Sequence, residues 1–181
     1  MRNRSALIAA VVGAAVLALV VVFALSPAGG QKDITSPIVG TVAPPIKGAN
    51  LHGGQVDLDS FKGEWVLVNF FATWCPPCVQ EHPELVKLSK DDGGPVQVLS
   101  VSFQDSSEKV WRFFKDNGGK WPVVTNDTGR IGVDYGVKGL PESFLISPYG
   151  QVVVKFEGGI TAKDIRGYVA KLEAQSEGGG S

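Results

Sequence analysis

The chain has 181 residues, enough for one domain with additional segments at its ends. Its 17 Lys and Arg residues nearly balance 18 Asp and Glu residues, and the net charge is −1. A chain without excess positive charge lacks the electrostatic signature of a nucleic-acid-binding protein. We therefore expect no nucleic-acid partner.

An apolar run of 20 residues, 6–25, stands near the amino terminus and contains no charged side chain. A helix of about 20 apolar residues spans a bilayer, and Arg2 and Arg4 before the run favour a cytoplasmic amino terminus. A cleaved signal peptide is the alternative, but its apolar region is usually shorter, and Pro27 follows the best cleavage site. We expect residues 1–25 to be a cytoplasmic stub and a single-pass membrane anchor, with the rest of the chain outside the cytoplasm.

Residues 26–37 are rich in Pro, Gly and Ser, which is typical of a linker. We place one globular domain at 38–174 and a flexible Gly-rich tail at 175–181. Apolar periodicity and turn residues then predict the elements of the domain. They are, in chain order, strands at 46–50 and 55–58, a turn at 59–63, a strand at 65–71, a helix at 76–91, a strand at 95–102, a helix at 106–117, a strand at 122–125, a short helix at 129–135, strands at 142–146 and 151–157, and a helix at 162–174.

This order is a hairpin, then strands alternating with helices, then a second hairpin and a helix. It predicts an α/β domain whose central mixed sheet has helices on both faces.

The only two cysteines stand together in Trp74-Cys75-Pro76-Pro77-Cys78, between a predicted strand and a predicted helix. Free N–H groups and the helix dipole favour an anion at that point, and a thiolate is the form that attacks a disulfide. We expect Cys75 to form a mixed disulfide with a partner, and Cys78 to resolve it. The alternatives are a structural disulfide or a zinc site. Zinc needs about four ligands, and the chain adds only two histidines, so we expect no metal and no cofactor besides the redox-active cysteine pair.

Two segments carry a family resemblance. Residues 66–78, Val-Leu-Val-Asn-Phe-Phe-Ala-Thr-Trp-Cys-Pro-Pro-Cys, resemble the active-site strand and motif of thioredoxin-like proteins, and residues 136–146, Gly-Val-Lys-Gly-Leu-Pro-Glu-Ser-Phe-Leu-Ile, resemble their second signature. With the early hairpin and the anchor, residues 38–174 resemble the TlpA/ResA/DsbE-like (CcmG-type) thiol-disulfide oxidoreductases. The resemblance implies a thioredoxin-like fold with an extra amino-terminal hairpin, and the reduction of apocytochrome c cysteines before haem attachment.

The resemblance also implies roles for single residues. Cys75 matches the exposed nucleophile and Cys78 the buried resolving thiol. Pro141 matches a cis-proline that faces the dithiol and offers backbone pairing to a substrate strand. Glu81 and Glu142 match two acidic residues of the group. For Glu142, a solvated acid at the end of a strand is the alternative.

Asn69 departs from general thioredoxins, which carry a buried aspartate at this position. Proton transfer must then fall to another residue. Glu81 follows Cys78 by three positions, so the two share a helix face. We expect Glu81 to take the proton of Cys78 during resolution, against the alternative of an ordinary acid in the first helical turn.

Trp74 and Leu140 are expected to form the surface that contacts the substrate, although Trp74 alternatively covers the edge of the core. His52 and His82 are expected at surface or turn positions. A copper metallochaperone is an alternative function, and it would use both thiolates with His82, which lies four residues after Cys78.

The expected partners are a protein substrate with a disulfide, either apocytochrome c or a broader set, and a membrane protein that passes electrons across the bilayer to the dithiol. Pro76 and Pro77 remove two N–H donors that would otherwise stabilise the thiolate. We therefore predict a reduction potential nearer about −270 mV than the value of about −120 mV of a strong oxidant.

Overall fold

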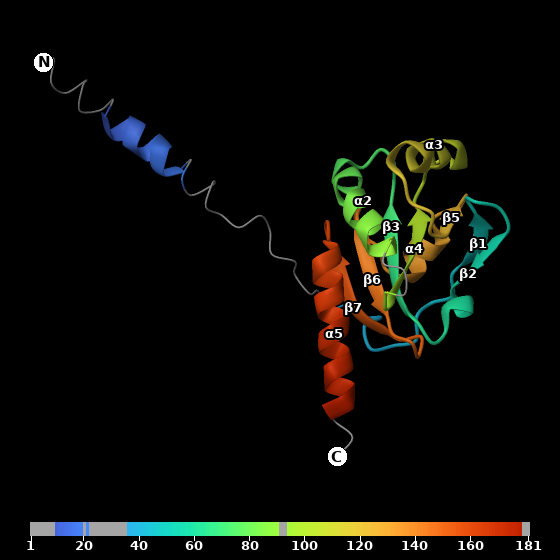
Figure 1. Ribbon diagram of the computed structural model, residues 1–181. Coiled ribbons are helices and arrows are strands. Elements are labelled where there is room, and N and C mark those ends of the chain that lie inside the picture. Colours follow the sequence, from blue (N-terminus) through green and yellow to red (C-terminus); the bar gives the residue numbers. More distant parts are fainter. Residues whose placement is uncertain (1–9, 20, 22–35, 91–93, 179–181) are drawn as a thin grey trace, which may run out of the picture. The chain divides into compact units, whose positions relative to one another are not determined.

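The structure, a computed structural model, describes residues 10–19, 21, 36–90 and 94–178 (Figure 1). It divides into two compact units, 1–30 and 31–181. In the first unit, residues 10–19 are helical. The described residues contain no helix whose length and apolar character would let it cross a membrane. Residues 6–9, 20 and 22–25 of the expected anchor and nearly all of the expected linker lie outside the described ranges, so the anchor stays a prediction.

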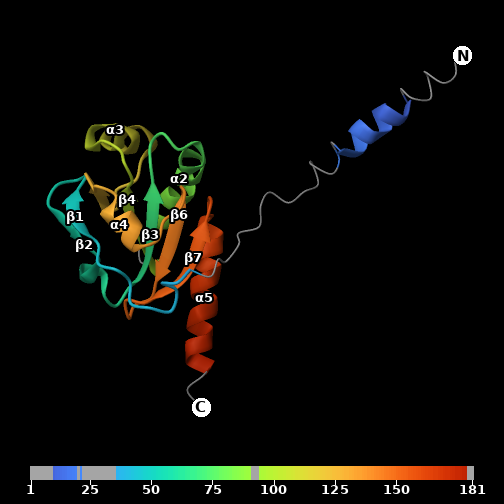
Figure 2. The ribbon, with the colours of Figure 1, turned by 180° about the vertical axis from the view of Figure 1, so that it is seen from behind.

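The second unit is built on a seven-stranded mixed sheet with the strand order β2-β1-β5-β4-β3-β6-β7 (Figures 1 and 2). Strands β3, β4 and β5 are parallel, and the other pairings are antiparallel. The predicted mixed sheet with an amino-terminal hairpin is confirmed. The strands are β1 Lys47–Asn50, β2 Gln55–Asp57, β3 Trp65–Phe71, β4 Val96–Ser102, β5 Val123–Thr125, β6 Glu142–Ile146 and β7 Val152–Glu157.

Helices cover both faces of this sheet, as predicted. One apolar cluster joins side chains of α2, α3 and α5 to the sheet, and a second joins those of α4 and the 3-10 helix η1. Figures 1 and 2 both show α5 running beside β7. The helices are η1 Leu58–Phe61, α2 Pro76–Ser89, α3 Ser107–Asn117, α4 Arg130–Asp134 and α5 Ala162–Gly178. Helix α5 extends to Gly178, beyond the predicted end at 174.

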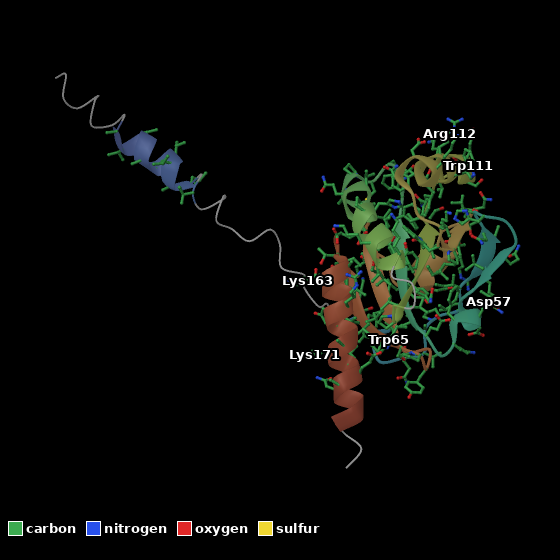
Figure 3. The ribbon with its side chains drawn as sticks, viewed as in Figure 1. Asp57, Trp65, Trp111, Arg112, Lys163 and Lys171 are labelled. Carbon is green, nitrogen blue, oxygen red and sulfur yellow. A yellow bond between two sulfur atoms is a disulfide. The ribbon has the colours of Figure 1, made fainter. Side chains whose placement is uncertain are left out.

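Strand β3 is an interior strand of the sheet and is buried along its whole length. Its alternate side chains enter the two clusters, Leu67 and Phe71 on the α2 side and Val68 and Phe70 on the α4 side, because successive side chains of a strand point to opposite faces. Trp65, which is labelled in Figure 3, begins the strand. Its indole N–H donates to the Glu173 carboxylate of α5 at 3.0 Å, which ties the base of the sheet to that helix.

The sheet register places two loops at one edge. Phe70, next to the last residue of β3, pairs with Glu142, the first residue of β6. The loop that leaves β3 carries the cysteine motif, and the loop that enters β6 carries Leu140 and Pro141. Segments about 65 positions apart in the sequence therefore meet at the carboxyl end of β3.

Candidate active site

The two cysteines form a disulfide at the amino terminus of α2. Cys75 is the N-cap residue, and its sulfur accepts a hydrogen bond from the Cys78 N–H at 3.3 Å. Both cysteines are 4% exposed. The expected contrast between an exposed Cys75 and a buried Cys78 is wrong for this oxidised state. The bond ties Cys75 to the buried sulfur of Cys78, and both residues belong to the apolar cluster that contains Phe71 and Leu85.

Asp105 fixes the turn that precedes the disulfide. One of its carboxylate oxygens accepts the Thr73 N–H at 2.8 Å and the Thr73 hydroxyl at 2.6 Å, while the other accepts the Ser106 N–H at 2.9 Å. Trp74 follows and is 58% exposed, so it lies on the surface and does not cover the core edge. Sequence reasoning missed Asp105, although an aspartate between a buried strand and a helix N-cap is a position where a carboxylate binds backbone N–H groups.

The Leu140–Pro141 peptide bond is cis, as predicted. Pro141 is buried and Leu140 is half-buried. The Pro141 carbonyl accepts the Gly158 N–H at 2.9 Å, which holds the start of β6 against the end of β7. Because Glu142 is paired with Phe70, this loop lies at the same sheet edge as the turn that carries Trp74 and the disulfide.

Glu81 is buried on the sheet-facing side of α2, with 4% of its surface exposed. One carboxylate oxygen accepts the Asn69 amide N–H at 3.1 Å, and the other accepts the Ile160 backbone N–H at 3.1 Å. The same Asn69 nitrogen donates to the Ser143 hydroxyl at 2.9 Å. Burial raises the pKa of Glu81 to about 7, although both hydrogen bonds oppose this rise. Glu81 also lies beyond the first turn of α2, so the alternative of an ordinary acid in the first helical turn is wrong.

Glu142 is also buried, at 3% exposed, so the alternative of a solvated acid at a strand end is wrong as well. One of its oxygens accepts the backbone N–H groups of Lys138 and Gly139, at 3.0 and 3.1 Å. The other lies 2.9 Å from the Lys155 ammonium, which also pairs with Glu157 at 3.1 Å. Burial acts to lower the pKa of Lys155, but the two carboxylates outweigh it, and the pKa is raised. Glu142 thus holds the loop before Pro141 in place.

His82 is buried, so its expected surface or turn position is wrong, whereas His52 is exposed as expected. The His82 ring packs among Phe113, Phe114 and Trp121, with centroid distances of 4.6, 5.1 and 5.3 Å. Its Nε2 lies 2.8 Å from the carbonyl oxygen of Gly118, so in the neutral ring this nitrogen donates to that oxygen. Burial lowers the pKa of His82, which favours the neutral form.

This position of His82 weakens the copper alternative, because Nε2 is bonded to a carbonyl at the end of α3. Within the described ranges, no three His, Cys, Asp or Glu side chains form a group that would hold a metal ion. The arrangement instead offers a disulfide, a neighbouring buried acid and an exposed tryptophan, Trp74. Chemically, it is suited to the exchange of electrons and protons with another disulfide.

Comparisons with known proteins agree with this chemistry. The redoxin family matches residues 38–172. The thiol-disulfide oxidoreductase ResA of Bacillus thuringiensis subsp. konkukian is 34% identical over 137 residues, which cover 74% of this chain and 78% of that protein. The thiol:disulfide interchange protein DsbE of Haemophilus influenzae is 33% identical over 135 residues, 73% of each chain. The solved thioredoxin domain of a Bacteroides vulgatus thiol-disulfide oxidoreductase is 29% identical with a TM-score of 0.67, covering 76% of this chain and 99% of that domain.

Proposed function

The chain belongs to the redoxin family and is a thiol-disulfide oxidoreductase, and we propose that it reduces protein disulfides outside the cytoplasm, with apocytochrome c as its substrate. One observation carries the proposal. The Cys75–Cys78 disulfide opens the same helix that, one turn later, presents a buried carboxyl group whose pKa lies near neutrality. The choice of apocytochrome c rests on the resemblance of residues 66–78 and 136–146 to the group that acts in cytochrome c maturation.

The reaction begins with the reduced dithiol. The Cys75 thiolate attacks one sulfur of the substrate disulfide, which forms a mixed disulfide and releases the other substrate sulfur as a thiolate that takes up a proton. Glu81 then accepts the proton of the Cys78 thiol. The new Cys78 thiolate attacks the Cys75 sulfur and releases the second substrate thiolate, which is protonated in turn. Two electrons pass to the substrate, and the Cys75–Cys78 disulfide is the product that the structure contains.

The surroundings of Glu81 suit this role. A general base works best when its pKa lies near the working pH, because it is then both available and able to release its proton afterwards. Burial supplies the shift, since an ionised carboxylate is poorly solvated in an apolar site. Asn69 and the Ile160 N–H limit the shift by donating to the ionised form.

We propose that the substrate docks on the surface formed by the exposed Trp74 and the half-buried Leu140, with an extended segment beside Pro141. We also propose that residues 1–25 anchor the chain in a bacterial cell membrane with the amino terminus in the cytoplasm. Each turnover oxidises the dithiol to the disulfide, and an oxidising compartment does not reduce it again, so a transmembrane electron donor must do so.

Trapping tests the proposal. Cys78→Ser in the native host should accumulate mixed disulfides through Cys75, because the adduct forms but nothing resolves it. Cys75→Ser is the matched control and should trap nothing. Apocytochrome c among the trapped proteins supports the proposal, and a broad set without it favours a general reductase. Trapping by Cys75→Ser alone would reverse the assigned roles.

The redox potential gives a second test. Pro76 and Pro77 occupy the first turn of α2, so the Cys78 N–H is the donor that the structure shows for the Cys75 sulfur. A poorly stabilised thiolate makes the disulfide hard to reduce. We expect equilibration with a dithiol buffer to give a potential near about −270 mV, whereas a value above about −180 mV would make the protein an oxidant or an isomerase.

A further inference from the structure

A single atom joins three buried side chains beside the active-site helix. The Asn69 amide nitrogen lies 3.1 Å from Glu81 Oε2 and 2.9 Å from Ser143 Oγ. Asn69 and Ser143 are fully buried, and Glu81 is 4% exposed. The other polar atom of the Asn69 amide, Oδ1, is buried too and has no hydrogen-bond partner within the described part of the chain. A buried polar atom without a partner is uncommon and often marks a functional site.

We propose that Asn69 and Ser143 are positioning residues for Glu81, and that a half-turn of the Asn69 amide lets Glu81 exchange its proton while it stays hydrogen-bonded. The inference rests on the proposed role of Glu81 as the proton acceptor of Cys78. In this role Asn69 orients Glu81 by hydrogen bonding, whereas an acid at the same position could itself transfer the proton.

The ionised state corresponds to the structure as it stands. The amide nitrogen carries two hydrogens, so it donates one to the Glu81 carboxylate and the other to the Ser143 hydroxyl oxygen. When Glu81 gains a proton on Oε2, that oxygen becomes a donor, and an amide N–H is no acceptor for it. A rotation of the amide by 180° about its last side-chain bond places Oδ1 where the nitrogen was.

In the rotated state, Oδ1 accepts two hydrogen bonds, one from the protonated Glu81 and one from the Ser143 hydroxyl. A hydroxyl group both donates and accepts, so Ser143 fits each state. The far end of the amide lacks a partner in both states, as the carbonyl oxygen in the observed one and as the NH₂ group in the rotated one, so each state leaves one end of the amide unpaired. The Ile160 N–H remains bonded to the other oxygen of Glu81 throughout.

Neighbouring charged groups do not account for the protonation of Glu81. On its own helix, Cys78 is in the disulfide, and Glu84 is held by Lys87 and the Ala162 N–H. From β3, β6 and the segment before α5, Glu81 faces the two positioning residues and a backbone N–H. Within the described ranges, no lysine, arginine or histidine forms an ion pair with Glu81. Its proton is therefore governed by burial and hydrogen bonds.

Nuclear magnetic resonance on the oxidised full chain in detergent micelles tests the rotation, because the disulfide prevents the cysteines from titrating. The Glu81 carboxyl carbon reports the midpoint between pH 5 and 9. Above that midpoint, the Asn69 amide protons should show a nuclear Overhauser contact to the Ser143 β-protons. Below it, the contact should disappear with the same midpoint. A contact that persists across the range overturns the proposal.

Glu81→Gln supplies the matched control. Its amide keeps accepting the Ile160 N–H and turns its own N–H₂ group toward position 69, so it resembles protonated Glu81 at every pH. The Asn69 contact to Ser143 should then be absent throughout. A contact at high pH in this variant would also overturn the proposal.

The rate of mixed-disulfide resolution provides a further test, because a purely structural role of Ser143 would not change this rate selectively. Ser143→Ala should slow the resolution of the mixed disulfide by about fivefold, the effect of one lost hydrogen bond, and leave the attack of Cys75 unchanged. Ser143→Thr keeps the hydroxyl and should restore the rate. Unchanged resolution in Ser143→Ala contradicts the inference. If the wild-type chain reduces no protein disulfide, the proposed function itself fails, so the two failures are distinct.

Discussion

Glu81 and Glu142 are two buried glutamates near one sheet edge, with 4% and 3% of their surfaces exposed. Both accept backbone N–H groups, from Ile160 in one case and from Lys138 and Gly139 in the other. They differ in their remaining partners. Glu142 pairs with the Lys155 ammonium at 2.9 Å, whereas Glu81 has the neutral amide of Asn69 at 3.1 Å. The two carboxylates are therefore equally buried but differ in their chemical surroundings, because one faces a charged partner and the other a neutral one.

A charged partner keeps a buried carboxylate ionised, while a neutral partner leaves it close to taking a proton. Burial raises the pKa of Glu81 to about 7, which suits proton transfer at neutral pH. The Glu142 and Glu157 carboxylates instead raise the pKa of Lys155 against the effect of burial, so the group stays charged. Glu81 is thus suited to moving a proton, and Glu142 to holding the loop that carries Pro141.

Removing the charged partner should have the largest effect. Lys155→Met leaves the Glu142 carboxylate buried without a cation, and a broken buried pair costs about 3–5 kcal/mol. We expect this loss in the free energy of unfolding at pH 8, measured by urea denaturation of the full chain in detergent.

The double variant Lys155→Met with Glu142→Gln is the control for that experiment. It removes both charges and should recover most of the lost stability, because no uncompensated charge remains buried. A loss below about 1 kcal/mol in the single variant would show that the pair behaves like an exposed one. The contrast between the two glutamates would then disappear.

Glu81→Gln should act in the opposite direction. The pKa of Glu81 in the folded chain, about 7, lies above its ordinary value of 4.5, so between these pH values the folded chain holds a proton that the unfolded chain has lost. Stability then falls as the pH rises from about 4.5 to about 7, by roughly 3 kcal/mol in total. The glutamine variant lacks this fall and should be the more stable chain at pH 8. A wild-type stability that does not change over this range would contradict the prediction.

The sequence predicted the reactive residues around Glu81 better than the residues that support the buried acids. Cys75 caps α2, and Cys78 and Glu81 lie within this helix, where a spacing of three residues places them on a common face. The same periodicity includes His82, whose buried position the pattern 78, 81, 82, 85, 88 also indicates. The surface prediction for His82 gave residue type more weight than this spacing.

The partners of the buried acids were beyond the reach of the sequence. Ser143 is the direct partner of Asn69 in the antiparallel register of β3 and β6. Lys155 reaches Glu142 diagonally, because the register of β6 and β7 pairs Glu142 with Glu157 and Lys155 with Phe144. A bulge after Leu145 shifts the second register. Which side chains face one another across strands depends on such details, which single-sequence patterns do not contain.

Asp105 offers an intermediate case, because its carboxylate is only half-buried and its partners are the N–H and hydroxyl of Thr73. Asp105→Ala should lower the free energy of unfolding by about 1–2 kcal/mol, since one charged hydrogen-bond acceptor is lost. It should also slow the reduction of protein disulfides, because the turn that presents Trp74 loosens. Asp105→Asn retains one acceptor oxygen and should lose less of both. Equal losses in the two variants would mean that shape, and not hydrogen bonding, holds this turn.

Glu157→Gln should have the smallest effect. It distinguishes the contributions of the two carboxylates that pair with Lys155. Glu157 lies 3.1 Å from the Lys155 ammonium, but its side chain is 34% exposed, whereas that of Glu142 is 4% exposed. Water and salt screen the outer pair, so its loss should cost at most about 1 kcal/mol and should depend on ionic strength. Glu142 still neutralises the buried ammonium in this variant. A loss as large as that of Lys155→Met would mean that the outer carboxylate, and not Glu142, compensates the buried charge.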